Sequence, residues 1–394
     1  MSEFDPYRPG AGRVPPLLAG REELLSAFDR VLAQTTGSGE GPRPWVLFGL
    51  RGVGKTALLN EFVQRGREAR WITVKVEATS SRSLGKAIAQ GLYRPLRDLR
   101  PVEQRAQEFL RAAVRVFASF QIRFDPSGAT TFGFDVEPEV GVADTGELQV
   151  DLVDLLTAVG LAARANGMGL LLAVDELQDA PPDDLQALNV ALHEIGQDAF
   201  PVPVVFIGAG LPSLPAVLAD ATSYAERLYD YRSIGLLSEP ATRQAFTVPA
   251  EAQGVHWSGE ALWAVVDHST GYPYFIQMAG HYAWEQRDGQ TIEIKAASKG
   301  IKLAQREVDE GLYRSRWERS TPAQREFLAA MAQDEGLDSS MNDLVHRLNR
   351  RRQSDLSVTR RDLIDAGHIY APERGFVAFT VPGMDSYIRR RPDL

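Results

Sequence analysis

A glycine-rich stretch near the N-terminus has the residue types and spacing needed to hold phosphate. Residues 49–56 read GLRGVGKT and satisfy the pattern G-x-x-x-x-G-K-[ST] at every fixed position. Glycines let the backbone curl so that several N–H groups point into one concavity, and a helix starting there adds the positive end of its dipole. The stretch therefore predicts a phosphate-binding loop, and a glycine-rich turn that binds nothing is the alternative.

Each position of this loop has an expected task. Lys55 should reach the β- and γ-phosphates, and the Thr56 hydroxyl should ligate Mg²⁺. The loop and the first helical turn are expected to contact the nucleotide through Gly49, Leu50, Arg51, Gly52, Val53, Gly54, Lys55, Thr56 and Ala57. The predicted cofactors are ATP and Mg²⁺.

A second stretch carries the carboxylates that hydrolysis of a nucleoside triphosphate would need. The apolar run LLLAV at residues 170–174 is followed by Asp175 and Glu176. Such a run is typical of a central parallel strand, which presents its chemistry at its carboxyl end. Asp175 is expected to hold Mg²⁺ beside Thr56, and Glu176 to polarise the attacking water. This pair favours hydrolysis over transfer to a small acceptor, and a solvated acidic turn is the alternative.

A parallel sheet must position these residues. Apolar runs predict strands at 45–48, 71–78, 170–176, 204–208 and 231–236, with helices between them. The predicted fold class is therefore α/β, a three-layer P-loop fold. Alternation at 120–124 and 131–136 around the turn DPSG predicts a hairpin insertion within residues 120–146.

Four motifs together resemble an AAA+ type P-loop ATPase of the STAND and origin-recognition-initiator branch, the archaeal-type ATPases. Two are the loop at 49–56 and the strand ending at Asp175-Glu176. The third is LLAGRE at residues 17–22, and the fourth is Gly-Tyr-Pro at residues 271–273. The resemblance spans nearly the whole chain and implies a core at 1–237, a helical lid at 238–315 and a winged helix-turn-helix at 316–394.

The resemblance also implies further site residues. Gly20 and Arg21 border the adenine, and Pro273 of the lid packs near the base. Arg227 would act as a finger that enters a neighbouring subunit, with Arg232 in reserve, so a nucleotide-dependent homo-oligomer is implied. An ordinary surface arginine that pairs with an acidic neighbour is the alternative for Arg227.

The chain departs from the family pattern at two sensor positions. The strand at 204–208 runs into GAGLPS without Asn or Thr, so Ser213 is only a poor substitute for a γ-phosphate sensor. No arginine follows Gly271 at the second sensor, where Gln277 and His281 stand. Slow basal hydrolysis is therefore expected, which suits a switch rather than a motor.

The C-terminal eighty residues predict three helices, starting near Thr321, Met341 and Val358, and then a short hairpin at 375–381. As a winged helix, the third helix would enter a major groove of duplex DNA. The residues expected to contact DNA are Thr359, Arg360 and Arg361 on that helix, Arg350, Arg351 and Arg352 before it, and Arg374 on the wing.

Charge leaves this DNA prediction open. Residues 316–394 carry 13 Lys or Arg against 12 Asp or Glu, and Asp355, Asp362 and Asp365 lie in or beside the third helix. A regulatory scaffold whose winged domain docks a protein partner is the alternative function.

Composition sets outer limits on the class of protein. The 394-residue chain has a formal charge of -9 and no cysteine, which excludes disulfides, thiolate metal sites and a cysteine nucleophile. Its apolar runs are shorter than a membrane span and no signal sequence is evident, so no membrane partner and a cytoplasmic location are expected.

Overall fold

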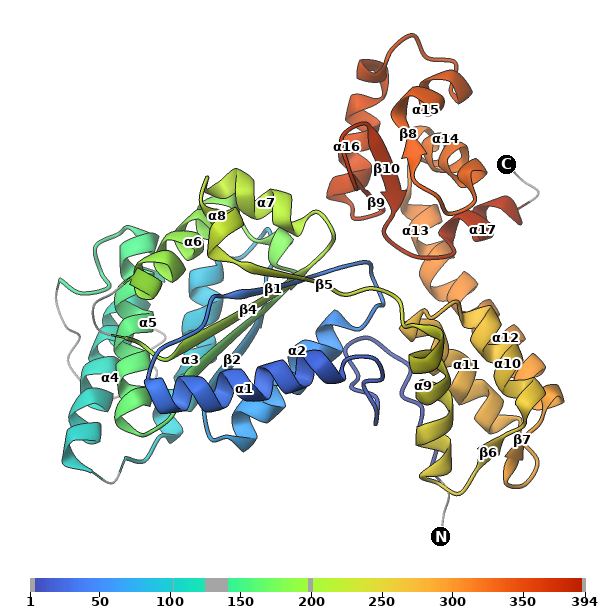
Figure 1. Cartoon of the computed structure of the whole chain (residues 1–394). Helices are drawn as coiled ribbons and strands as arrows, with labels where there is room; N and C mark the ends of the chain where they lie inside the picture. The colour runs from blue at the N-terminus through green and yellow to red at the C-terminus, as the bar shows by residue number, and fades with distance from the viewer. Residues whose placement is uncertain (1–3, 102, 125–140, 198–200, 392–394) are drawn as a thin grey trace.

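The computed structural model describes residues 4–101, 103–124, 141–197 and 201–391 (Figure 1). Within these ranges, none of the helices combines the length and the apolar character that crossing a bilayer requires.

The centre of the fold is a five-stranded sheet in which every neighbouring pair is parallel, in the order β2-β3-β4-β1-β5. The strands are β1 (Trp45–Phe48), β2 (Ile72–Glu77), β3 (Leu170–Asp175), β4 (Val204–Gly210) and β5 (Asp230–Ser233). The carboxyl ends of β1 and β3 lie on either side of β4, so the glycine-rich loop and Asp175 meet at one edge of the sheet. The predicted α/β class with a parallel sheet is confirmed.

Helices cover both faces of this sheet (Figure 1). α1 (Glu22–Ser38) and α2 (Lys55–Glu68) pack on one face, against residues such as Leu47 and Leu171. The other face, which includes Val46 and Leu172, is covered by α3 (Leu84–Asp98), α4 (Gln104–Phe124), α5 (Leu148–Ala165), α6 (Pro182–Gln197) and α7 (Leu214–Ala221). Because side chains alternate along a strand, continuous apolar runs supply both interfaces.

The predicted hairpin insertion is wrong in its first half. Residues 120–124 belong to α4 instead of a strand, and the segment 131–136 lies outside the described residues. Four apolar residues of α4 itself are buried in the core, namely Ala113, Val116, Phe117 and Phe120. Their spacing of three and four residues forms one helical stripe, and this longer period continues through the short alternating run.

A helical lid follows β5. It contains α9 (Glu239–Glu251), α10 (Gly259–Ser269), α11 (Pro273–Glu285) and α12 (Ile294–Glu307), with a two-stranded sheet of β6 (His256–Trp257) and β7 (Thr291–Ile292). A π-helical segment (Val308–Tyr313) joins α12 to α13 (Arg314–Arg319). The predicted domain boundary between residues 315 and 316 therefore falls inside α13, and the three-domain division itself stays a prediction.

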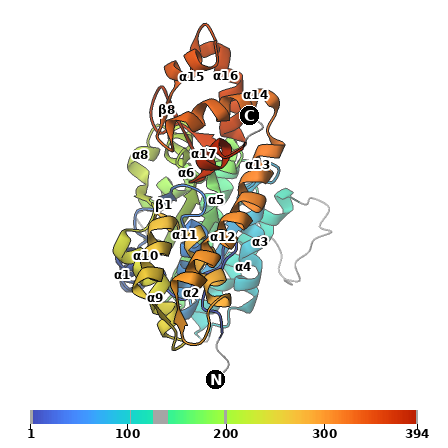
Figure 2. The same cartoon turned by 90° about the vertical axis from the view of Figure 1, so that its right-hand side faces the viewer.

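In the C-terminal region helices begin close to the three predicted starts and a hairpin follows them, but a short strand before the second helix and a final helix were not predicted. The elements of this region are α14 (Pro322–Met331), β8 (Ser339–Ser340), α15 (Met341–Arg347), α16 (Ser357–Asp365), β9 (Ile369–Tyr370), β10 (Phe376–Phe379) and α17 (Met384–Arg389). The strands form an antiparallel sheet in the order β8-β10-β9. α13 leads from the lid to this C-terminal unit (Figures 1 and 2). That it is a DNA-binding winged helix remains a prediction.

Candidate nucleotide-binding site

The glycine-rich loop turns sharply between β1 and α2. Gly52 and Gly54 have φ angles of 77° and 99°, in the left-handed region that favours glycine. A Cβ at Gly49 would lie 2.1 Å from the Ile234 carbonyl oxygen, and one at Gly52 would lie 2.2 Å from the Tyr272 hydroxyl. The loop is therefore built around glycine at three positions, two of them because another segment packs directly against the backbone.

Lys55 is buried at the base of this loop and is only 7% exposed. Its Nζ donates to the carbonyl oxygens of Gly49 at 2.9 Å and Leu50 at 2.8 Å. Burial lowers the pKa of Lys55 to about 8, although the Glu176 and Asp175 carboxylates act in the opposite direction. The arrangement is a poorly solvated cation in a backbone cradle, which an anion would stabilise.

Asp175 ends β3 and is 5% exposed. Its Oδ2 lies 3.7 Å from Nζ of Lys75 on β2. Lys75 in turn donates at 2.6 Å to Oδ1 of Asn60, which is on α2 one turn after Thr56. The carboxylate is thus linked through two side chains to the helix that begins at the glycine-rich loop.

Glu176 has a left-handed backbone with φ 47° and both of its carboxylate oxygens have partners. Oε2 accepts a hydrogen bond from Gln178 Nε2 at 2.7 Å, while Oε1 lies 3.5 Å from Nη1 of Arg51. Oε1 of Gln178 accepts from the Leu211 N–H at 3.0 Å, just beyond β4. Gln178 therefore connects Glu176 to the end of the neighbouring strand.

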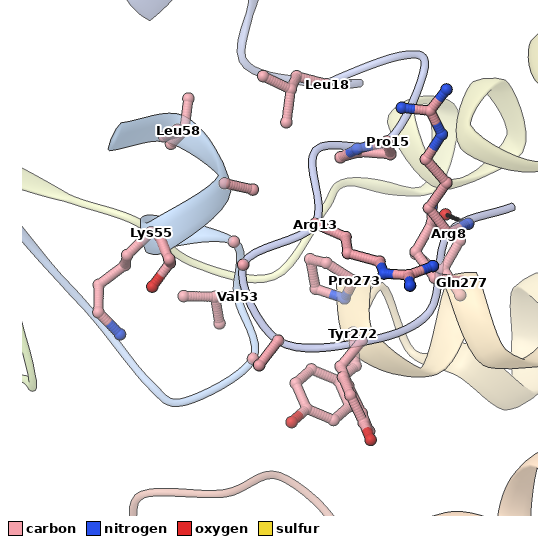
Figure 3. A pocket seen from close by; sticks show the side chains of 18 of the residues that line it. Arg8, Arg13, Pro15, Leu18, Val53, Lys55, Leu58, Tyr272, Pro273 and Gln277 are labelled. Atoms are coloured by element: carbon pink, nitrogen blue, oxygen red, sulfur yellow. Dashed lines mark hydrogen bonds between the residues drawn. The ribbon is translucent and has the colours of Figure 1, made fainter. Parts of the chain in front are cut away.

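A cavity of about 380 Å³ adjoins these groups (Figure 3). The residues of the predicted site that line this cavity are Arg21, Arg51, Gly52, Val53, Gly54, Lys55, Thr56, Ala57, Glu176 and Pro273. Gly20, Gly49, Leu50 and Asp175 are not part of its wall. The structure thus brings most of the predicted site residues around one hollow.

The lid and the segment before α1 meet the loop at this cavity. Arg21 donates through Nη2 to the Gly235 carbonyl oxygen at 2.5 Å and to that of Val53 at 3.5 Å. Burial lowers the pKa of Arg21. On the lid side, the Tyr274 N–H donates to the Gly52 carbonyl oxygen at 3.2 Å, beside Pro273 at the start of α11.

Arg227 lies away from the cavity of its own chain. It lies in the last turn of α8 (Ala225–Leu228), just before β5, and Trp45 pairs with Asp230 at the amino-terminal edge of the sheet. The cavity lies at the carboxyl edge. Arg232, by contrast, has partners within the chain, with its guanidinium 3.7 Å from the Trp45 ring centroid and 2.7 Å from an Asp230 carboxylate oxygen.

Of the residues at the expected sensor positions, Ser213, Gln277 and His281, only Gln277 lines the cavity. Ser213 precedes α7 and makes no side-chain cap for it. Gln277 lines the cavity and accepts at Oε1 from the Arg8 N–H at 3.0 Å, whereas His281 pairs with Asp5.

The C-terminal unit touches the glycine-rich loop through Arg51. The Arg51 N–H donates to the Thr380 carbonyl oxygen at 2.9 Å, and a Cβ at Gly367 would lie 2.7 Å from Arg51 Nη2. Arg316 of α13 donates to the Gly367 carbonyl oxygen at 3.1 Å. Burial and the Arg51 and Arg319 guanidinium groups lower the pKa of Arg316 to about 10. A cluster of arginines therefore joins the loop to the C-terminal unit.

Sequence reasoning missed several polar residues at the site, namely Arg8, Arg13, Asn60, Lys75, Gln178 and Arg316. Asn60 had a detectable signal, because it lies four residues after Thr56 and so shares its helix face. Gln178 also lies close to a predicted residue, two positions after Glu176, whereas Arg8, Arg13, Lys75 and Arg316 are at distant sequence positions and come together with the site only by folding.

Comparisons with known proteins agree with this geometry. A protein-family model described as an AAA ATPase domain matches residues 17–207, and one described as a domain of unknown function matches residues 310–388. No curated protein matches the chain.

Two solved structures resemble nearly the whole chain. One is the Walker-type ATPase of Pyrococcus abyssi, 16% identical with a TM-score of 0.54 over 94% of this chain and 96% of that one. The other is the ORC2 protein of Aeropyrum pernix in its ADP form, 15% identical with a TM-score of 0.57 over 96% of both chains. Residues 17–207 thus match an AAA ATPase domain, within a chain that has the α/β fold of P-loop NTPases.

Proposed function

We propose that the chain is a nucleotide-switched ATPase that binds ATP with Mg²⁺ and hydrolyses it to ADP and phosphate. The observation that carries this proposal is the buried Lys55 ammonium, held in a glycine cradle at the sheet edge where Asp175 and Glu176 emerge. A buried cation whose pKa is already lowered by burial gains most from a polyanionic ligand.

The donor set suits the cation as well as the phosphates. The Thr56 hydroxyl and the Asp175 carboxylate are hard oxygen ligands, which Mg²⁺ prefers while keeping several of its waters. Bound there, the metal would neutralise charge on the phosphate oxygens. The link from Asp175 through Lys75 to Asn60 would keep the carboxylate oriented toward α2.

Different residues of the chain would carry out different parts of the hydrolysis. Glu176 would accept a proton from the attacking water, and its contacts with Gln178 and Arg51 would set its orientation. Gln178 fills the place between β3 and β4 where the sequence lacks the expected sensor. Arg227 lies at the opposite sheet edge, so as a finger it would stabilise the leaving phosphoryl charge in another copy of the chain, within a homo-oligomer.

Two substitutions test the assignment. Lys55→Ala should abolish ATP binding measured by calorimetry, because the cradle loses its cation. Glu176→Gln should keep binding within about twofold but lower kcat by about a hundredfold or more, as expected for loss of a general base. Equal hydrolysis by Glu176→Gln and the wild-type protein would contradict the role of Glu176.

We also propose that the C-terminal unit binds duplex DNA. Arg361 and Arg374 are exposed, as a phosphate contact requires. Retardation of a DNA duplex at several salt concentrations, with and without ATP, tests this, since phosphate contacts make affinity fall steeply with salt. No retardation even at low salt would refute it.

A protein-docking role is the second candidate, and two ion pairs favour it. Arg350 pairs with Glu326 at 3.2 Å, and Arg352 pairs with Asp355 at 3.4 Å, so two of the expected phosphate contacts have carboxylate partners within the chain. Asp362 and Asp365 are exposed on α16. A partner protein with basic side chains would meet this surface without repulsion.

A further inference from the structure

The outer face of α12 in the lid carries a row of basic side chains. Its members are Lys295, Lys299, Lys302 and Arg306, all of them exposed, and we call them the lysine row. We propose that the lysine row binds the phosphate backbone of duplex DNA, as a contact separate from the C-terminal unit. This inference rests on the proposed DNA binding and adds a second place at which the same duplex is held.

The spacing of these residues gives them one direction. Steps of four, three and four positions place side chains on the same face of a helix. The opposite face of α12 is buried at Ala296, Ala297, Gly300 and Ala304. A Cβ at Gly300 would lie 2.6 Å from the Ala283 backbone nitrogen of α11, so the two helices are in close contact and the rotation of α12 is fixed. The row therefore points away from the lid into solvent.

The row differs from an ordinary solvent-facing helix surface. Its members neighbour one another at i,i+3 and i,i+4, and like charges at these spacings destabilise a helix. Among the residues that the structure describes, the three lysines form no ion pair, and only Arg306 has a carboxylate partner, Glu310 at 2.8 Å. By contrast, Arg314 of α13 has Glu318 one turn away at 2.6 Å. The charge of the three lysines is thus available to a partner.

Composition makes this row unusual for the chain. The whole sequence has a formal charge of -9 and contains six lysines, of which three lie in the row. The 14 residues of α12 include four basic residues and one acidic residue, Glu307. Half of the lysines therefore stand on one face of a single helix, on a protein that is acidic as a whole. A local surplus of this kind attracts a polyanion.

A phosphate backbone matches the row better than an acidic protein surface does. Protein interfaces are depleted in lysine and centre on aromatic or arginine side chains, whereas the other exposed residue between Lys295 and Lys302 is Ser298. Lysine is a compact point charge that suits single phosphate oxygens. At 1.5 Å per residue the row spans about 16 Å, a length over which one strand of a duplex presents about five phosphates. The row and a DNA strand thus have comparable linear charge densities.

The row is within reach of a duplex that also contacts the C-terminal unit. α12 continues through the π-helical segment and α13 to that unit (Figure 2). From Lys295 to Arg319 this path measures about 36 Å at 1.5 Å per residue, which is about one turn of B-DNA. A duplex of about 25 bp, which has more than two turns, is therefore long enough to contact both places.

The test measures binding of a labelled duplex of about 25 bp to the full chain by fluorescence anisotropy at several salt concentrations. The variant Lys295→Ala/Lys299→Ala/Lys302→Ala should lower the slope of log K against log salt by about 2.7, because each phosphate contact contributes about 0.9. Its affinity at about 0.1 M salt should fall by about tenfold or more. Replacing the same three lysines by arginine keeps the charge and should retain the affinity within about twofold.

A matched control removes three exposed arginines from the core, Arg30→Ala/Arg67→Ala/Arg82→Ala, and should keep the wild-type slope. Urea unfolding of the lysine variant should show undiminished stability, because its like-charge neighbours are gone.

The outcomes separate the two proposals. Equal slopes for the wild-type protein and the lysine variant would overturn the role of the row while DNA binding by the C-terminal unit stands. No binding of the duplex by the wild-type protein, even at low salt, would overturn both. Tighter binding of poly-L-glutamate than of the duplex, lost in the lysine variant, would make the row a docking site for an acidic protein and would also overturn the proposal.

Discussion

His368 links the stability of the chain to pH. It is half-buried where the C-terminal unit meets the glycine-rich loop, just after Gly367. Burial, followed by the nearby Arg316, Arg319 and Arg51 guanidinium groups, lowers the pKa of His368 from 6.5 to about 4. The folded state therefore disfavours a proton that the unfolded chain would accept.

The sign and size of the effect follow from this shift. Above pH 6.5 the ring is neutral in both states and has no influence. Between pH 6.5 and 4 the unfolded state binds more protons, so stability falls as the pH falls. The full shift corresponds to about 3 kcal/mol, and because the ring is partly exposed, screening reduces the expectation to about 2 kcal/mol.

The assay is urea unfolding at pH 7.5 and 4.5 without nucleotide, followed by tryptophan fluorescence, for the wild-type protein and His368→Gln. Trp317 of α13 is buried close to this contact and should report on it. Groups common to both proteins cancel in the difference, so His368→Gln should gain about 2 kcal/mol relative to wild type on acidification. The exposed His256→Gln serves as control. A difference that does not change with pH would refute the reasoning.

Three further outcomes are expected. Asn189→Ala should lower the free energy of unfolding by about 3 kcal/mol, because Asn189 is fully buried and accepts a hydrogen bond from the Tyr229 hydroxyl at 2.6 Å. Urea unfolding measures this loss, and adding Tyr229→Phe should recover part of it. Arg232→Ala should cost about 1 kcal/mol through its stacking on Trp45, yet leave hydrolysis per bound ATP nearly unchanged. Arg227→Ala should lose most hydrolysis but regain some when mixed with a variant that cannot bind nucleotide; no recovery would place the arginine's role within one chain.

Motifs with short spacing were predictable from the sequence. The glycine-rich loop at 49–56 and the carboxylates after the run at 170–174 are local patterns, because backbone turns and strand ends depend on neighbouring residues. The strand expected at 120–124, the first half of the predicted hairpin, was wrong because five residues fit either period, and α4 buries Phe120 in its apolar stripe. A short pattern cannot decide between helix and strand when a longer one continues through it.

The sequence by itself was enough to predict a phosphate-binding loop and the parallel sheet that positions it. Only the tertiary structure decided that Tyr7 hydrogen-bonds to the lid, that Thr380 contacts Arg51, and that Arg227 lies at the sheet edge opposite Lys55. The first two are contacts between residues more than two hundred positions apart in the sequence. These positions depend on how whole helices and strands pack together, and no short spacing of residues in the sequence encodes that packing.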